Sequence, residues 1–106
     1  TLGDQVRSIL ERGLHGHWPS SGDVATRLAI SPQHVRRLLR DEGTSLAAIK
    51  EELLRDAAIA GLVRGETVDA LTTRLGFSEP SAFRRAFKRW TGATPPAYQP
   101  KRAATR

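Results

Sequence analysis

Hydrophobic residues recur at helical spacing in successive segments of this chain. They follow steps of three and four around 6–14, 24–30, 32–41, 46–60, 68–75 and 80–91. Such steps place apolar side chains on one face of an α-helix, and no segment shows a usable strand pattern. A short last helix around Tyr98 makes about seven helices in all. The pattern therefore predicts an all-α fold.

Capping residues predict where several of these helices begin. Ser31 stands before Pro32, and this pair is typical of a helix start because serine accepts from free backbone N–H groups and proline fits the first helical position. Ser45 and Thr67 are expected to cap the fourth and fifth helices, and Ser78 the sixth.

Two apolar stripes indicate buried helix faces. In the long fourth helix the predicted stripe steps through Leu46, Ile49, Leu53, Ala57 and Ala60, and Leu54 and Ala58 widen it. In the sixth helix the expected buried face carries Phe83, Phe87 and Trp90, whose spacing favours a core role over a ligand pocket.

The chain also contains an internal duplication. VATRLAIS at 24–31 is matched by LTTRLGFS at 71–78, an offset of 47 residues, and the arginine pair at 36–37 is matched at 84–85, an offset of 48. Each copy predicts a helix, a tight turn and a second helix with outward arginines, which is the layout of a helix-turn-helix. We expect two homeodomain-like helix-turn-helix subdomains over 1–44 and 65–99, a connecting helix over 45–64, and a basic disordered tail over 100–106.

Charge is concentrated near the end of the chain. The net charge is +6, and from Phe77 onward there are seven basic residues against one acidic residue, Glu79. This surplus favours a polyanionic partner, and double-stranded DNA is the first expectation. There is no cysteine and no apolar run long enough to span a membrane, so we expect a cytoplasmic, nucleoid-associated protein.

The outward positions of the second helix in each copy carry residue types that recognise DNA. Arginine matches the O6 and N7 atoms of guanine, and glutamine matches adenine. A helix in the major groove reads bases mainly with its N-terminal half and contacts phosphates with its flanks. The base-reading residues predicted in this way are Gln33, Arg36, Arg37, Ser81 and Arg85.

Phosphate contacts are expected around these positions. The predicted set is Ser31, His34, Arg40, Ser78, Lys88, Arg89 and Thr94, and simple exposure is an equal alternative for His34. Glu79 either accepts from a cytosine amino group or stabilises the positive end of its helix, and the second role is favoured. Arg27 and Arg74 either reach the DNA backbone or pair with acids such as Asp23.

The same residues resemble the signature of AraC-type transcriptional regulators. GFSEPSAFRRAFKRWTG at 76–92, followed by Thr94, Pro95 and Tyr98, resembles the family's second reading helix and its flank. SPQHVRRLLRDEGTS at 31–45 looks like the first reading helix and the turn after it. The resemblance covers roughly 6–98, and its motif is long and gapped in a fixed way.

What the resemblance implies is more specific than the pattern alone. It implies two helix-turn-helix subdomains that read adjacent major-groove segments, and it adds Arg84 and Pro80 to the base-contacting positions. It also implies an activator that contacts RNA polymerase, with a sensing or dimerising domain upstream of this chain, which opens on Thr1. Thr72 stands where the family usually has alanine, so the fifth helix is expected to pack less tightly.

Other functional classes have weaker support in the sequence. His15 and His17 lack a nearby acid or cysteine to complete a metal site, and no phosphate loop or nucleophile motif is present. We therefore expect no enzyme activity, no metal and no cofactor. A helical protein–protein interaction module and a non-specific architectural DNA binder remain the alternatives.

Overall fold

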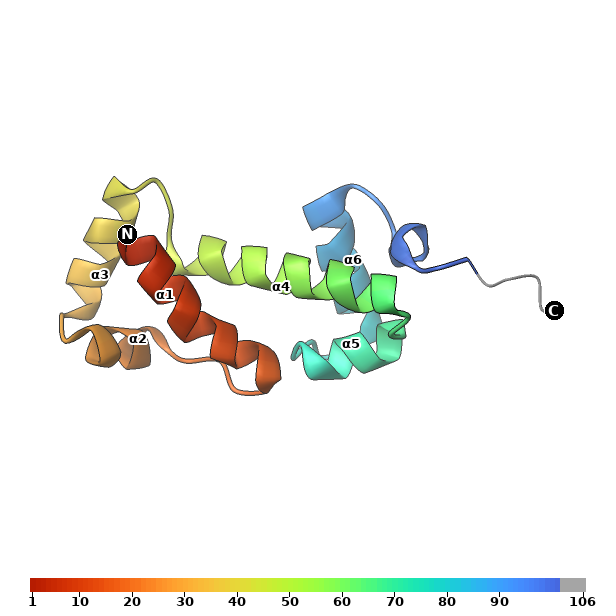
Figure 1. Ribbon diagram of the computed structural model, residues 1–106, viewed down its shortest axis with the longest axis horizontal. Helices are drawn as coiled ribbons and strands as arrows, with labels where there is room; N and C mark the ends of the chain where they lie inside the picture. The colour runs from red at the N-terminus through yellow and green to blue at the C-terminus, as the bar shows by residue number, and fades with distance from the viewer. Residues whose placement is uncertain (102–106) are drawn as a thin grey trace. The chain divides into compact units, whose positions relative to one another are not determined.

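The structure is a computed structural model that describes residues 1–101. These residues form six α-helices and two 3₁₀ helices, with no β-strand among them (Figure 1). The elements are α1 (Leu2–Leu10), η1 (Glu11–His15), α2 (Ser21–Leu28), α3 (Pro32–Asp41), α4 (Leu46–Arg64), α5 (Val68–Arg74), α6 (Pro80–Thr91) and η2 (Pro95–Tyr98). The all-α prediction is confirmed. Residues 102–106, most of the predicted tail, lie outside the described part.

Contacts between residues divide the chain into two units, with the boundary inside α4 between Leu54 and Arg55. The first unit contains α1, η1, α2, α3 and the first half of α4. The second contains the rest of α4 with α5, α6 and η2. Each unit thus holds one of the two predicted helix-turn-helix copies.

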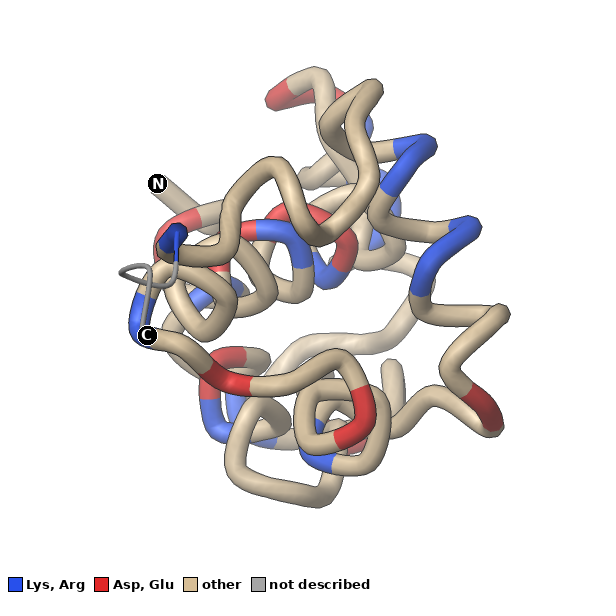
Figure 2. Tube along the Cα trace, turned by 90° about the vertical axis from the view of Figure 1, so that its right-hand side faces the viewer, with Lys and Arg blue, Asp and Glu red and all other residues tan. Residues whose placement is uncertain are grey.

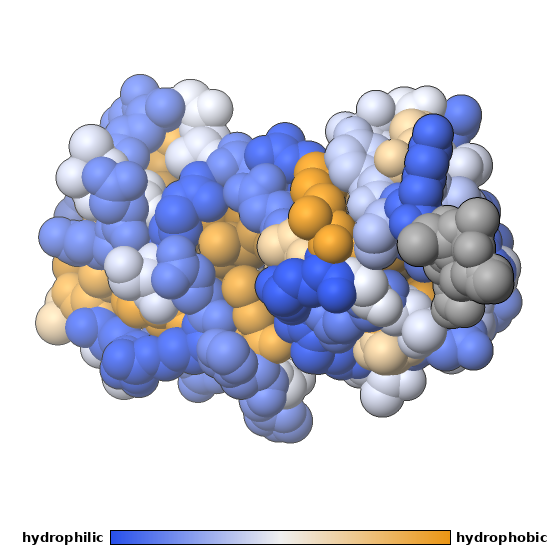
Figure 3. All heavy atoms as spheres, turned by 45° about the vertical axis from the view of Figure 1, so that its right-hand side comes forward, coloured by the Kyte–Doolittle hydropathy of each residue, from blue (hydrophilic) through white to orange (hydrophobic). Residues whose placement is uncertain are grey.

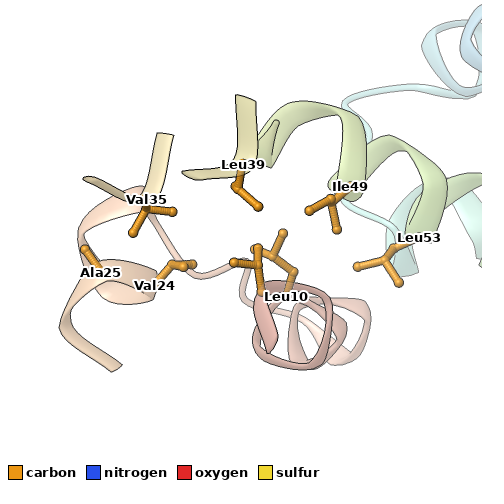
Figure 4. Packing of buried hydrophobic residues seen from close by; sticks show 8 residues of the cluster. Leu10, Val24, Ala25, Val35, Leu39, Ile49 and Leu53 are labelled. Atoms are coloured by element: carbon orange, nitrogen blue, oxygen red, sulfur yellow. The ribbon is translucent and has the colours of Figure 1, made fainter. Parts of the chain in front are cut away.

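The first unit is held together by aliphatic side chains from four helices. They point toward one another between the helices, as Figure 4 shows. The buried cluster consists of Val6, Leu10, Val24, Ala25, Val35, Leu39, Ile49 and Leu53. Since α1, α2, α3 and α4 contribute two residues each, removing any one helix would expose apolar surface on the other three.

The second unit has an aromatic core instead. Phe83 and Phe87 of α6 are fully buried, with ring centroids 5.9 Å apart. Phe77 meets Phe83 edge-on at 5.6 Å, and Tyr98 of η2 meets Phe87 edge-on at 5.3 Å. Trp90, expected in the same buried face, is half-buried and lies 6.1 Å from Phe77.

Helix α4 buries most of the apolar stripe predicted from its sequence, but not the end of that stripe. Its first half places Ile49 and Leu53 in the core of the first unit. Its second half buries Ala58 and Leu62, whereas Ala60 is exposed. At 100° per residue, Ala58 lies about 140° around the helix from Leu53, so the two units use different faces of α4. Leu54 and Ala58, which widen the predicted stripe, are buried as expected, whereas the predicted end of the stripe at Ala60 was wrong.

The predicted caps of α4 and α5 are confirmed. The Ser45 hydroxyl accepts from the backbone N–H of Ala48 at 3.0 Å, and Thr67 does the same for Ala70 at 3.0 Å. Thr72 is buried in α5, and its hydroxyl donates to the carbonyl of Val68 at 2.7 Å. Its polar group is therefore satisfied inside the helix, and the looser packing expected at this position is not seen.

The seventh predicted helix is a 3₁₀ turn rather than an α-helix. In η2 the N–H of Ala97 bonds to the carbonyl of Thr94 at 3.0 Å, and that of Gln99 bonds to Pro96 at 3.2 Å. Pro95 and Pro96 have no N–H, so a four-residue segment beginning with them cannot build the i to i−4 pattern of an α-helix.

The turn between the two helices is the same in both copies. The N–H of Ala29 bonds to the carbonyl of Thr26 at 3.1 Å, and the N–H of Gly76 bonds to Thr73 at 3.2 Å. Both residues are left-handed, with φ of 59° at Ala29 and 85° at Gly76. This conformation suits glycine but is unfavourable for alanine because its Cβ approaches the following carbonyl.

Exchanging these two residue types should therefore have opposite effects on stability. Gly76→Ala is expected to lower the free energy of unfolding by about 1 kcal/mol. A Cβ at Gly76 meets nothing within 4 Å, so this loss comes from the backbone alone. Ala29→Gly should raise the free energy of unfolding by up to about 1 kcal/mol. Urea denaturation measures both values, and a change of the same sign in both variants would contradict the explanation.

Candidate nucleic-acid interface

Helix α3 is rotated by its cap and its buried face. Ser31 is the N-cap, and its hydroxyl accepts from the N–H of His34 at 3.1 Å. Pro32 occupies the first turn. Val35 and Leu39 are fully buried, which turns the remaining positions of the helix toward solvent.

The predicted reading residues of the first copy share this outward face. Gln33, Arg36, Arg37 and Arg40 are exposed, and His34 is half-buried. With Ser31, these five side chains line one open depression on the surface of the first unit. The structure thus brings together every base-reading and phosphate-contacting residue predicted for this copy.

Helix α6 repeats the arrangement in the second unit. Phe83, Ala86 and Phe87 face the core. The outward residues are Arg84, Arg85, Lys88 and Arg89, all exposed, while Ser81 is half-buried near the start of the helix. Thr94 lies beyond the end of α6 as the exposed N-cap of η2.

Ser78 does not cap α6 as predicted. The N-cap is Glu79, and Pro80 follows it in the first turn. The reason is the inserted residue that changes the offset between the copies from 47 to 48. Proline favours the first helical position, so it fixes the preceding residue as the cap, which is Ser31 before Pro32 but Glu79 before Pro80. Ser78 remains in the turn and is exposed.

Several arginines outside α3 and α6 are ion-paired, whereas most of the outward cations on these two helices are not paired within residues 1–101. Arg7 pairs with Glu52, Arg55 with Asp56, and Arg64 with Glu66. In contrast, six cations on α3 and α6 have no ion-pair partner within residues 1–101, namely Arg36, Arg37, Arg40, Arg84, Arg85 and Lys88. Uncompensated cations on an exposed helix face attract a polyanion.

The distribution of charge along the chain is consistent with this separation. Acidic and basic positions are interspersed along the trace in Figure 2. In the view of Figure 3, hydrophilic residues cover most of the visible surface and apolar ones appear in smaller areas. The surplus of basic residues from Phe77 onward can be counted in the sequence, whereas the structure shows which cations are ion-paired.

Arg74 and Arg27 occupy equivalent positions but have different surroundings. The guanidinium of Arg74 donates to both carboxylate oxygens of Glu66, at 2.7 and 3.0 Å. Arg27 forms no ion pair with Asp23 or any other acid within residues 1–101. The carboxylate of Asp23 accepts from the backbone N–H of Ser20 at 3.0 Å, and this bond lowers the pKa of Asp23. Of the two interpretations, pairing holds for Arg74, although its partner is Glu66.

The pairing of Glu66 with Arg74 could not be identified from the sequence. Its residues are eight positions apart and lie on different elements, so no helical spacing identifies them. Gly61 of α4 makes room for the pair: a Cβ there would lie 2.7 Å from Glu66 Oε1 and 3.2 Å from Arg74 Nη2. A second missed contact is Lys50 Nζ, 4.9 Å from the centre of the Trp18 ring.

Neither a metal centre nor a membrane span is found in the described part of the chain. Among residues 1–101, no group of three or more histidine, cysteine, aspartate or glutamate side chains is placed to hold a metal ion. No helix in the same range is long and apolar enough to cross a membrane.

The hydrogen bonds that Glu66 accepts from Arg74 should make the free energy of unfolding depend on pH. These bonds lower the pKa of Glu66 below its ordinary value near 4.5. A lowered folded-state pKa gives a stabilising contribution that is complete above the ordinary value and is lost as the pH falls through the folded value. Glu66→Gln should therefore unfold more easily than the wild type at neutral pH, and the difference should shrink in acid.

Urea denaturation at several pH values between about 3 and 7 tests this dependence. The matched control is Glu11→Gln, which neutralises an exposed carboxylate that forms no ion pair within residues 1–101. A difference between Glu66→Gln and the wild type that stays constant with pH would show that the charge of Glu66 is not responsible.

Comparison with known proteins gives consistent results. Residues 24–101 match the family model described as "Helix-turn-helix domain". The chain is 44% identical over 95 residues to the "Uncharacterized HTH-type transcriptional regulator Rv1395" of Mycobacterium tuberculosis, covering 88% of this chain and 27% of that protein. It is 40% identical over 76 residues to the "HTH-type transcriptional regulator VqsM" of Pseudomonas aeruginosa, covering 71% of this chain and 23% of that protein.

A solved structure shows the same likeness in three dimensions. The transcriptional regulator CdpR from Pseudomonas aeruginosa superposes with a TM-score of 0.79 at 32% identity, over 92% of this chain and 31% of that one. This chain therefore spans about a quarter to a third of the length of these relatives.

Proposed function

Because this chain belongs to the AraC-type helix-turn-helix family and is a DNA-binding domain of a bacterial transcription regulator, we propose that it reads two adjacent major-groove segments and activates transcription. α3 reads one segment and α6 reads the other. The subdomains over 1–44 and 65–99, joined by the connecting helix over 45–64, are the units of this reading.

One observation supports the two-segment proposal most strongly. Both α3 and α6 bury one apolar face and expose cations that have no ion-pair partner within residues 1–101. Pro32 and Arg36 of α3 correspond to Pro80 and Arg84 of α6 at the same offset of 48. A phosphate-holding module has no need to present equivalent exposed residues on both helices.

The roles of the individual residues follow from their positions on these helices. Base reading is assigned to Gln33, Arg36, Arg37, Ser81, Arg84 and Arg85. Phosphate contacts are assigned to Ser31, His34, Arg40, Ser78, Lys88, Arg89 and Thr94. Except for Arg37, the reading residues lie in the N-terminal halves of α3 and α6, where side chains meet base edges, and except for His34 the phosphate residues lie at the helix ends and flanks.

The connecting segment has a suitable length. α4 has 19 residues, which is about 28 Å of helix, and successive major-groove segments on one face are about 34 Å apart. Activation would involve contact with RNA polymerase. In the whole regulator, a sensing or dimerising domain would occupy part of the length that this chain does not cover.

Selection of duplexes from a random-sequence pool tests the proposal directly. Two enriched motifs about one helical turn apart are expected. One motif would mean that the second unit only holds phosphate. No enrichment, together with binding that is lost steeply with salt, would leave the architectural role. A protein–protein module would bind no duplex at all.

Two substitutions on α6 should separate base reading from phosphate contact. Arg85→Ala should weaken binding to the selected site by about 1–3 kcal/mol and relax the base preference at one position. Lys88→Ala should weaken all sequences alike and reduce the salt slope by about one. Fluorescence anisotropy on selected and scrambled duplexes measures both effects.

Arg55→Ala is the matched control for these two variants, because it removes a cation that already pairs with Asp56. It should change binding to DNA little. Equal losses on selected and scrambled duplexes for Arg85→Ala would contradict its base-reading role.

A further inference from the structure

The two reading helices begin with different chemistry. Ser31 and Glu79 are the N-caps of α3 and α6, each followed by a proline. The Ser31 hydroxyl is used within the helix, since it accepts from the N–H of His34. Glu79 makes no hydrogen bond from its side chain to the backbone of α6. Its carboxylate oxygen accepts instead from the hydroxyl of Ser81.

This contact decides which hydrogen bonds the start of α6 can offer to a ligand. A serine hydroxyl has one proton to donate, and an ionised carboxylate only accepts. With its proton directed at Glu79, Ser81 has only acceptor lone pairs left. The start of α6 therefore presents side-chain acceptors alone. The corresponding residue of α3 at the offset of 48 is Gln33, whose amide both donates and accepts.

The charge of Glu79 suits the positive N-terminal end of α6, where it is the N-cap, but no cationic side chain within residues 1–101 compensates it. It is exposed and forms no ion pair with any residue in the range 1–101, although Arg84 and Arg85 lie on the helix it begins. It is also the one acidic residue from Phe77 to the end of the chain. A carboxylate close to DNA phosphates is repelled, and a hydrogen bond accepted from a base would offset that repulsion.

We propose that Glu79, held by Ser81, is a specificity-determining residue that selects cytosine through its N4 amino group. This inference rests on the proposed DNA-reading function. In the major groove, guanine and thymine present acceptors at this edge, which repel a carboxylate, while cytosine presents the N4 donor. Adenine also has an amino group, but its neighbouring N7 is an acceptor. Cytosine is thus the base that the acceptor-only pair fits best.

The test combines site selection with one isosteric substitution. The half-site read by α6 is identified as the one whose base preference Arg85→Ala relaxes. The wild type should prefer cytosine at one position of that half-site, and replacing that C·G pair by T·A should weaken its binding about tenfold. Glu79→Gln should reduce this discrimination to less than about threefold. It should also bind scrambled duplexes more tightly, because the repulsion is removed.

Two controls separate this role from simpler ones. Glu11→Gln neutralises an exposed carboxylate in the first unit and should leave the base preference unchanged. Ser81→Ala removes the hydroxyl that positions Glu79 and should lower the discrimination to a value between those of the wild type and Glu79→Gln. Thermal melting checks that each variant remains folded, as expected for a Glu79 side chain that makes no backbone cap.

The outcomes distinguish this inference from the proposed function. If Glu79→Gln binds every duplex more tightly with an unchanged cytosine preference, Glu79 only repels DNA and the inference is overturned. The same holds if the α6 half-site shows no cytosine preference. If the wild type enriches no sequence, the proposed function fails, and the inference fails with it.

Discussion

The burial of one face of α3 and one face of α6 is the constraint on which the rest of the arrangement depends. Val35 and Leu39 in the first unit, and Phe83 and Phe87 in the second, are fully buried. Each pair is spaced by four, so it fixes the rotation of its helix. Once this rotation is set, the side chains on the opposite face of each helix point toward solvent. The exposed cations are therefore placed by the core and not by interactions of their own.

Much of the fold could be predicted because it depends on local chemistry. Ser45 and Thr67 cap α4 and α5 as expected, since a cap involves residues three positions apart. The end of the apolar stripe in α4 could not be predicted. It depends on which residues of the second unit pack against α4, and periodicity within the helix does not show where that packing stops.

In the candidate site too, features set by local spacing could be predicted from the sequence, and features set by tertiary packing could not. Exposure of Arg36 and Arg85 follows from helical spacing, whereas the pairing of Arg74 with Glu66 depends on tertiary packing around Gly61. The cap of α6 lies between these cases. Both copies have a serine at the end of the repeated turn, but the proline decides where the helix begins, so similarity between the copies predicted the wrong cap.

The same inserted residue has a consequence for the geometry of the complex. Two identical readers would fit a direct repeat, in which the half-sites have the same sequence. The two readers here begin with Ser31 and Glu79 and continue with Gln33 and Ser81, so they would recognise unlike half-sites. With identical half-sites, either reader could occupy either half-site and binding could shift by one repeat. With unlike half-sites each reader would accept only its own, so a regulator built in this way would bind its operator in a single register.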